Sequence, residues 1–256
     1  MEPAPLKGSF NMAVDEYLFR AASSDGRTYV RFYGWQRPTV SLGYSQRIGD
    51  VLDLDFCRSH GIDIVRRITG GKLVLHHREV TYSVCSAEGA VFTSSLADSY
   101  RLISRALIRG LEKMGLEASL AEAAPASYSR GFMPCFSLPA RDEIEIAGRK
   151  IVGSAQKRVG PRFLQHGSIP LESDPDLLRQ VSLPKGKESE FCLTSLSQAL
   201  GRAVTFEWAV DRLAAGFMEF FGVEPEAWNI PLKEMSVVRK IEESRYDNPG
   251  WTLERQ

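Results

Sequence analysis

The stretch RRITGGKLVLHHREVTYS, residues 66–83, decides the fold that we predict for this chain. It holds the end of a strand over 62–67, a second strand over 72–76 and the start of a third over 79–85, with tight connections between them. The Gly70–Gly71 pair lets the backbone turn sharply and lets a ligand approach it closely. A plain hairpin needs neither paired arginines nor paired histidines, so we interpret the stretch as part of a binding site as well.

Two simple interpretations of this stretch fail on spacing. TGGK invites comparison with a phosphate-binding loop, but the Walker pattern needs glycine and a hydroxyl residue where Arg66 and Leu73 stand. A metal site needs converging ligands, whereas His76 and His77 are neighbours on a predicted strand and point to opposite faces. We therefore predict neither a Walker-type loop nor a metal site.

Hydrophobic periodicity predicts the elements outside this stretch. Helices are expected over residues 10–21, 51–59, 95–114, 194–201, 205–222 and 232–244, and strands over 28–34, 39–43, 143–148, 149–158 and 162–169. The segment 121–134 is interpreted as a loop, and 170–192 as loop with a short helix. The pattern predicts the α/β class: a single domain with a mixed, mostly antiparallel central sheet flanked by helices, and much pairing between strands that are neighbours in sequence.

Composition limits the classes of function. The 256 residues carry a formal net charge of zero, which disfavours nucleic acid as a partner because such binders usually have a basic excess. No apolar run is long enough to cross a membrane, and MEPAPLKGSF lacks the apolar core of a secretory signal, so we expect a cytoplasmic protein with no membrane partner. The four cysteines form no CxxC pair, so neither a zinc site nor a disulfide framework is predicted.

Three glycine-bearing segments share one style, with small residues and polar side chains at strand ends. They are RRITGG (66–71), GRKIVGSAQ (148–156) and LQHGS (164–168). Hydrogen-bond donors within them are Lys150, Gln156 and His166. Together they could line a slot for an extended, partly apolar substrate with a carbonyl head. The alternative is three ordinary tight turns.

Cys135 is the cysteine with a candidate chemical role. Lys150 follows it by fifteen residues, beyond a predicted strand and turn, and antiparallel pairing could bring the two together. A nearby ammonium lowers a thiol pKa, and a thiolate is a natural nucleophile for acyl transfer from a thioester. The alternative is a structural cysteine that behaves as a small buried hydrophobe.

The stretch IVRRITGGKLVLHHREVTYSV (64–84) resembles the signature of the biotin/lipoate protein ligase and octanoyltransferase superfamily. GSFNMAVDEYL (8–18) is similar to its opening helix, and GRKIVGSAQKRVGPRFLQHGSI (148–169) to its second signature. The likeness covers roughly residues 8–255, with the motifs in the expected order. It implies one catalytic domain over 1–256, with a core over about 28–225, an N-terminal helix over 9–22 and a C-terminal helical tail.

Within the superfamily, the chain resembles most closely the cysteine-dependent octanoyltransferases of the type found in Gram-positive bacteria. They share the ExTYS ending seen at 79–83, the CF pair of PCFSLPARDEI and the lysine of GRKIxGSAQ, which fall on Cys135 and Lys150. Ligases usually have a third glycine where Lys72 stands. Two positions depart from the family pattern. His77 stands where relatives usually have an acidic residue, and Leu73 replaces a common alanine.

The resemblance implies transfer of an octanoyl group from acyl carrier protein to a lysine of lipoyl domains or of the glycine cleavage H protein, through an acyl-cysteine. It implies Cys135 and Lys150 as catalytic residues. The implied substrate-binding residues are Arg67, Thr69, Gly70, Gly71, His76, Gly153, Ser154, Gln156, His166 and Gly167.

The implied enzyme has no resident cofactor and no metal, because the acyl group arrives on the phosphopantetheine of the carrier. We expect a monomer with transient protein partners, and a loop over 121–134 that could act as a lid. Two alternatives stay open. One is an ATP-dependent lipoate–protein ligase in which Lys150 contacts the adenylate phosphate, and the other is a non-catalytic lipoyl-domain binder.

Overall fold

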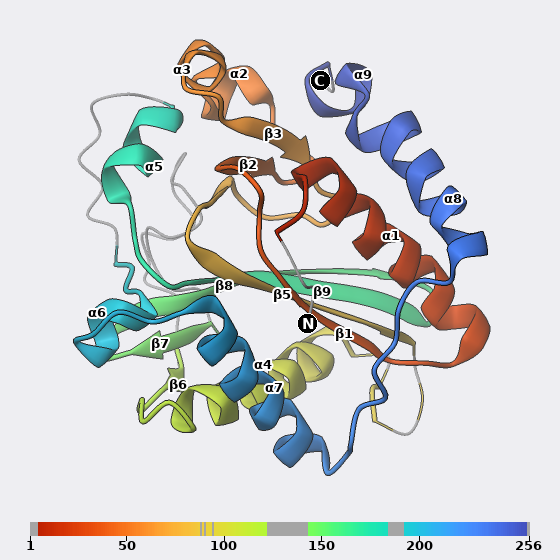
Figure 1. The fold of residues 1–256 in the computed structure, drawn as a ribbon, viewed down its shortest axis with the longest axis vertical. Coiled ribbons are helices and arrows are strands. Elements are labelled where there is room, and N and C mark those ends of the chain that lie inside the picture. Colours follow the sequence, from red (N-terminus) through yellow and green to blue (C-terminus); the bar gives the residue numbers. More distant parts are fainter. Residues whose placement is uncertain are drawn as a thin grey trace.

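Two β-sheets and the helices around them make up the described part of the chain (Figure 1). The computed structural model describes residues 5–87, 89, 91–93, 95–121, 143–183 and 192–254. The predicted α/β class, with helices flanking mixed and mostly antiparallel strands, is confirmed. The strands divide between a large and a small sheet, which the stretch 66–83 connects.

The large sheet contains six of the described strands in the order β1–β5–β9–β8–β7–β6, and its neighbouring strands are antiparallel. They are β1 (Tyr29–Tyr33), β5 (Glu79–Ala87), β9 (Arg162–Pro170), β8 (Arg149–Val159), β7 (Ile144–Ile146) and β6 (Ser119–Leu120). The small sheet has the order β3–β2–β4, from β3 (Asp63–Arg66), β2 (Thr39–Leu42) and β4 (Val74–His76). Its β2–β3 pair is parallel, so the mixed character comes from the small sheet.

The connection between β4 and β5 carries the chain from the small sheet to the large one. Between His76 and Glu79, Arg78 has a φ of 50°, an uncommon left-handed conformation. The sequence predicts pairing between neighbouring strands, and that prediction is wrong here: β4 pairs with β2, whereas β5 pairs with β1 and β9. It holds for the β7–β8 hairpin, which turns at Ala147–Gly148.

Helices cover both faces of the large sheet. In Figure 1, α4 (Leu96–Glu112) and α7 (Phe206–Phe221) lie below it, and α1 (Gly8–Asp25) lies above it with α8 (Leu232–Ile241) and the small sheet. Apolar side chains fill the lower layer, where the rings of Phe32 and Phe217 meet edge to face with 5.8 Å between centroids. A second apolar cluster joins α1 to α8.

The helical predictions are confirmed with one exception. Helices α4, α7 and α8 lie in predicted ranges, and α1 extends beyond the predicted 10–21 at both ends. The shorter elements include α5 (Pro175–Val181), α6 (Leu196–Leu200), the π-helical turn η1 (Glu242–Tyr246) and α9 (Pro249–Thr252). The single helix predicted over 51–59 is wrong. Leu52 pairs with Ser182 instead, which separates α2 (Ile48–Val51) from α3 (Leu54–Ser59). Within the described ranges, no helix is long and apolar enough to cross a membrane.

The C-terminal tail anchors the start of the stretch 66–83. Arg66 is fully buried, and its guanidinium donates to backbone carbonyls on two segments, at Gly43, Gln46, Trp251 and Thr252. The indole N–H of Trp251 donates in return to the Arg66 carbonyl at 2.8 Å. Arg66 therefore holds the tail against the small sheet, and it is a structural residue rather than part of the pocket described below.

Candidate functional site

A pocket lies where helix α1 meets both sheets. Its empty volume, including the space at its mouth, is about 370 Å³. It is lined by Met12, Tyr33, Trp35, Ser41, Arg67, Val74, His76, Thr81, Gly153, Ser154, Ala155, His166, Gly167 and Ser168. All ten predicted substrate-binding residues are described, and six line the pocket: Arg67, His76, Gly153, Ser154, His166 and Gly167. The three glycine-bearing segments therefore meet around one cavity.

One wall of the pocket is polar because β5 and β9 alternate between apolar and polar residues. The apolar residues of β5 face the core between the large sheet and helices α4 and α7, and they are Val80, Tyr82 and Val84. The buried polar residues between them are Glu79, Thr81 and Ser83. The register of the two strands sets polar residues opposite each other, Thr81 with Ser168 and Ser83 with His166.

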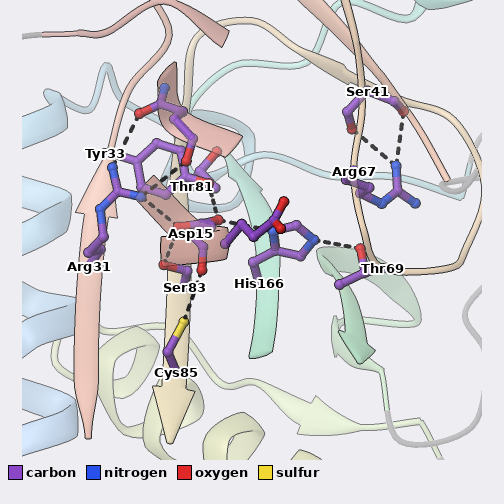
Figure 2. Close-up of polar contacts among 12 residues, drawn as sticks. Asp15, Arg31, Tyr33, Ser41, Arg67, Thr69, Thr81, Ser83, Cys85 and His166 are labelled. Carbon is purple, nitrogen blue, oxygen red and sulfur yellow. Dashed lines mark hydrogen bonds and ion pairs between the residues drawn. The ribbon is translucent and has the colours of Figure 1, made fainter. Parts of the chain in front are cut away.

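A buried carboxylate on α1, Asp15, organises part of this wall (Figure 2). It accepts hydrogen bonds from Arg31 Nη1 at 2.5 Å, Tyr33 Oη at 2.9 Å and Ser83 Oγ at 2.8 Å, and it lies 3.2 Å from His166 Nδ1. Burial alone raises the pKa of Asp15, but the charge of Arg31 and the bonds that the carboxylate receives outweigh burial and lower the pKa. Asp15 is therefore ionised at neutral pH and can only accept hydrogen bonds.

His166 links Asp15 to the glycine loop. Its Nε2 atom lies 2.7 Å from Thr69 Oγ1, and burial lowers the pKa of the ring although Asp15 lies nearby. A neutral ring beside an ionised carboxylate carries its hydrogen on Nδ1, so Nε2 accepts from the Thr69 hydroxyl. Thr69 is fully buried behind the ring and does not line the pocket itself.

A second buried carboxylate, Glu79, organises another part of the wall. It accepts hydrogen bonds from His76 Nδ1 at 2.8 Å, from Trp35 Nε1 at 3.2 Å, and from the hydroxyls of Thr81 and Ser168. Burial raises the pKa of Glu79, but His76 and the hydroxyl donors outweigh burial and lower the pKa, so Glu79 is ionised at neutral pH. The ring of His76 stacks on Trp35 with 4.0 Å between centroids.

Both ring nitrogens of His76 are engaged within the protein, because Nε2 lies 2.8 Å from Ser41 Oγ. His77 follows the end of β4 and is half-buried, with Nδ1 3.9 Å from Asp174. In the described part of the chain, no three His, Cys, Asp or Glu side chains come together in a way that could hold a metal ion.

Arg67 fixes the shape of the glycine loop. Its guanidinium donates to the carbonyls of Ser41, Gly70 and Lys72, at 2.9, 2.9 and 2.7 Å. Gly71 has a left-handed φ of 92°, and a Cβ added at Gly43 would lie 2.0 Å from the Gly71 carbonyl oxygen. Gly70 and Gly71 are exposed outside the pocket lining, so they shape the loop that carries Arg67 and Thr69.

Lys150, a predicted catalytic residue, lies in β8 outside the pocket lining. Its ammonium is fully buried, 2.5 Å from Glu143 Oε1. Gly153 lines the pocket three residues farther along the strand, a separation of about 10 Å. Cys135 lies outside the described residues, and so does the predicted loop from residue 122 onward.

Gln156 is the predicted wall residue that the structure places elsewhere. Its amide donates to Gln165 Oε1 at 3.0 Å, and the Gln165 amide donates to Tyr82 Oη at 3.0 Å. Tyr82 belongs to the core between the large sheet and helices α4 and α7, so the side chain of Gln156 lies on the face of the large sheet opposite Asp15. Gln156 is absent from the pocket lining.

The residues that sequence reasoning missed include the two carboxylates and the aromatic part of the wall. Asp15 left a signal, because it stands within the apolar run of a helix, where a charge needs a buried partner. Glu79 left another, because it begins a strand in which polar and apolar residues alternate. The sequence gives no such signal for Tyr33 and Trp35, since aromatic side chains in and beside strands are ordinary core residues.

Solved structures define the fold class first. Lipoate-protein ligase A bound with ATP superposes with a TM-score of 0.83 at 23% identity, over 99% of this chain and 98% of that chain. A bi-partite lipoate protein ligase from Thermoplasma acidophilum gives a TM-score of 0.80 at 21% identity, over 99% and 96% of the two chains. At these identities the likeness shows a shared fold.

Sequence comparison then defines the family. The model of the lipoyl protein ligase A/B catalytic domain matches residues 7–218, so the chain belongs to this family. Octanoyltransferase LipM of Kyrpidia tusciae is 39% identical, over 92% of this chain and 92% of that protein. Octanoyltransferase LipM of Symbiobacterium thermophilum is 36% identical, over 97% of this chain and 95% of that protein.

Proposed function

We propose that this protein is an octanoyltransferase of lipoate assembly. It takes an octanoyl group from octanoyl-acyl carrier protein and places it on the target lysine of a lipoyl domain or of the glycine cleavage H protein. One observation carries the proposal: relatives named octanoyltransferase LipM are between 32% and 39% identical over at least 92% of this chain. The proposed setting is the cytoplasm, with the enzyme acting as a monomer.

The proposed reaction has two steps. The Cys135 thiolate attacks the octanoyl carbonyl carbon, an S–C bond forms, and the bond to the phosphopantetheine sulfur breaks as the carrier thiolate takes up a proton. The neutral amine of the acceptor lysine then attacks the acyl-cysteine, its nitrogen loses a proton to water, and Cys135 leaves as a thiolate. Thioester exchange is nearly balanced and amide formation runs downhill, so the reaction needs no ATP, metal or resident cofactor.

Lys150 is proposed to keep Cys135 ionised, because a neighbouring ammonium lowers a thiol pKa. Chain connectivity supports this pairing: Glu143, the ion-pair partner of Lys150, follows Cys135 by only eight residues. Cys57 and Cys85 are poorer candidates, because both are buried and burial raises the pKa of Cys85 well above its usual value.

The pocket is proposed to hold the octanoyl chain. Its wall is mainly carbon where a ligand would touch it, and it lies about 10 Å along β8 from Lys150. A chain whose carbonyl sits near Lys150 could therefore extend into this pocket. Within the proposal, Gly153 and His166 contact the chain directly, whereas Thr69, Gly70 and Gly71 act by shaping the loop.

The test is the intact mass of the protein after incubation with octanoyl-acyl carrier protein. We expect an octanoyl adduct that maps to Cys135, and transfer to H protein without ATP. Cys135→Ala removes both, whereas the matched control Cys192→Ala, which changes the partly exposed cysteine beside Lys150, keeps both. Lys150→Met lowers kcat by roughly 10²- to 10⁴-fold.

Two outcomes would contradict the proposal, and each points to one of the other two functions. Octanoylation of H protein that requires ATP and free octanoate, and that survives Cys135→Ala, identifies an ATP-dependent ligase. Binding of a lipoyl domain with neither an adduct nor transfer identifies a non-catalytic binder.

A further inference from the structure

The side chains that donate hydrogen bonds to Glu79 all belong to the wall of the pocket, and the proposed function assigns Glu79 no role. Among the described residues, its carboxylate accepts hydrogen bonds from four side chains, those of Trp35, His76, Thr81 and Ser168. All four line the pocket, whereas Glu79 itself is buried behind them. One ionised group therefore sets the orientation of four wall residues.

This arrangement determines what the wall offers to a ligand. The hydrogens of the Thr81 and Ser168 hydroxyls point at the carboxylate and are unavailable inside the pocket. The Trp35 N–H is shared between Glu79 and Thr81 Oγ1, at 3.2 and 2.7 Å. These four side chains therefore donate no hydrogen bond to a ligand, which meets their carbon atoms, ring faces and hydroxyl oxygens.

We infer that Glu79 is the specificity-determining residue of the pocket, and that it makes a polar-looking wall accept an unsubstituted hydrocarbon chain and reject a hydroxylated one. This rests on the proposed function, since the ligand is taken to be the octanoyl group. Beside these four side chains, a buried hydroxyl on the chain would find their hydrogens already engaged with Glu79, and a buried hydroxyl with incomplete hydrogen bonding is costly. Glu79 acts through the four donors, so it is a positioning residue rather than a catalytic one.

The experiment measures kcat/KM for octanoyl-acyl carrier protein and for hydroxyoctanoyl carriers with the hydroxyl at successive carbons. Wild-type protein is expected to prefer the octanoyl donor by roughly tenfold to a hundredfold for at least one hydroxyl position. Glu79→Gln replaces one acceptor oxygen with an amide donor, so at least one wall donor must turn toward the pocket. In this variant, we expect the ratio of kcat/KM for the octanoyl donor to kcat/KM for the hydroxyoctanoyl donor to fall at least tenfold.

The matched control is Glu16→Gln, the same change at another buried carboxylate. Glu16 accepts from Arg20 within α1, and from Arg245 and Tyr246, which join α1 to the C-terminal tail. None of the three donors lines the pocket. A loss of folding stability without a role in selection lowers both kcat/KM values equally, which is the expectation for Glu16→Gln. A changed ratio in Glu79→Gln alone marks selection.

Ser168→Ala tests the role of Glu79 in selection if Glu79→Gln does not fold. The removed hydroxyl leaves a small space beside Glu79 Oε2, where a hydroxylated chain can donate instead. The relative rate for at least one hydroxyoctanoyl donor should rise about two- to tenfold, the value of one hydrogen bond.

The outcomes separate the two proposals. Wild-type protein that transfers no octanoyl group overturns the proposed function. Wild-type protein that transfers octanoyl and hydroxyoctanoyl groups equally well overturns the inference alone. So does a preference that remains unchanged in both Glu79→Gln and Ser168→Ala.

Discussion

The two faces of the large sheet are built from the same strands but carry different chemistry. Toward α4 and α7, β5 and β9 present mostly apolar side chains, with Gln165 as a buried polar exception, and the Phe163 ring packs against Phe92 with 5.0 Å between centroids. Toward α1, the same strands present Glu79, Thr81, Ser83, His166 and Ser168, all buried. The apolar face is held by area removed from water, and the polar face by hydrogen bonds to two carboxylates.

The difference between the faces shows how a pocket can be buried, polar in sequence and still suited to a hydrocarbon ligand. An apolar face can repack around a substituted side chain. A hydrogen-bond network with few acceptors cannot replace an acceptor that a substitution removes. Substitutions on the polar face should therefore change function and stability together. Substitutions on the apolar face should change mainly stability.

The largest effect is expected from Asp15→Asn. The variant leaves the buried Arg31 without its 2.5 Å ion pair, which should cost about 3–5 kcal/mol of unfolding free energy in urea. Octanoyl transfer should fall as well, because His166 loses the group that orients it. Asp25→Asn makes the same change at the exposed end of α1 and should leave activity unchanged. An unfolding free energy that is unchanged in Asp15→Asn would show that Asp15 does not hold the polar face together.

Gly167→Ala tests the point where the two faces meet. A Cβ at this position would lie 2.5 Å from the Gly153 carbonyl oxygen and 2.7 Å from the Tyr82 ring, so β8 and β9 must move apart. We expect a loss of about 1–3 kcal/mol in stability and a higher KM for the octanoyl donor. Gly49→Ala, which meets no atom within 4 Å, is the control and should cost nothing. Equal behaviour of the two variants would contradict the close approach.

His166→Gln tests the polar face through pH. Because burial lowers the pKa of His166 below 6.5, the unfolded chain binds more protons than the folded one just below that pH. Wild-type stability should therefore fall as the pH drops below 6.5, by at most about 1.4 kcal/mol per pH unit. The variant should lack this step.

The two carboxylates do not interfere in that window. Their lowered pKa values mean that their contributions are present above 4.5 for Glu79 and 3.8 for Asp15, and are lost only at lower pH. Melting temperatures measured between about pH 5 and pH 8 check the prediction. Parallel curves for wild type and variant would show that His166 does not titrate as its burial requires.

The smallest effect is expected from Gln156→Ala. Its side chain lies on the apolar side, so kcat/KM should stay within about twofold of wild type and stability should fall by about 1 kcal/mol or less. Gln165→Ala, which removes bonds to both Gln156 and Tyr82, should cost more. A loss of activity larger than tenfold in Gln156→Ala would restore the binding role that the sequence predicts.

Much of the fold follows from local pattern. Helices α1, α4 and α7 were readable because their apolar residues recur with helical spacing, and the β7–β8 hairpin because glycine marks its turn. The division of the strands into two sheets could not be predicted from the local sequence pattern. Both β4 and β5 look like partners of the strand beside them, and only competition with β1, β2 and β9 decides otherwise.

The candidate site divides in the same way. His76, Gly153 and His166 were found because they lie in short segments with an unusual combination of glycine and polar residues. Asp15 and Glu79 were missed because a carboxylate next to apolar residues has no meaning until its donors are known.

The sequence by itself determined the family signature, the order of the segments that meet at the pocket, and the alternation that gives the large sheet one polar face. Only the tertiary structure decided which charges that face contains and which way its hydroxyls point. The physical reason is distance along the chain. Asp15 and His166 are 151 residues apart, and no local pattern records a hydrogen bond that forms only when helix α1 packs across β9.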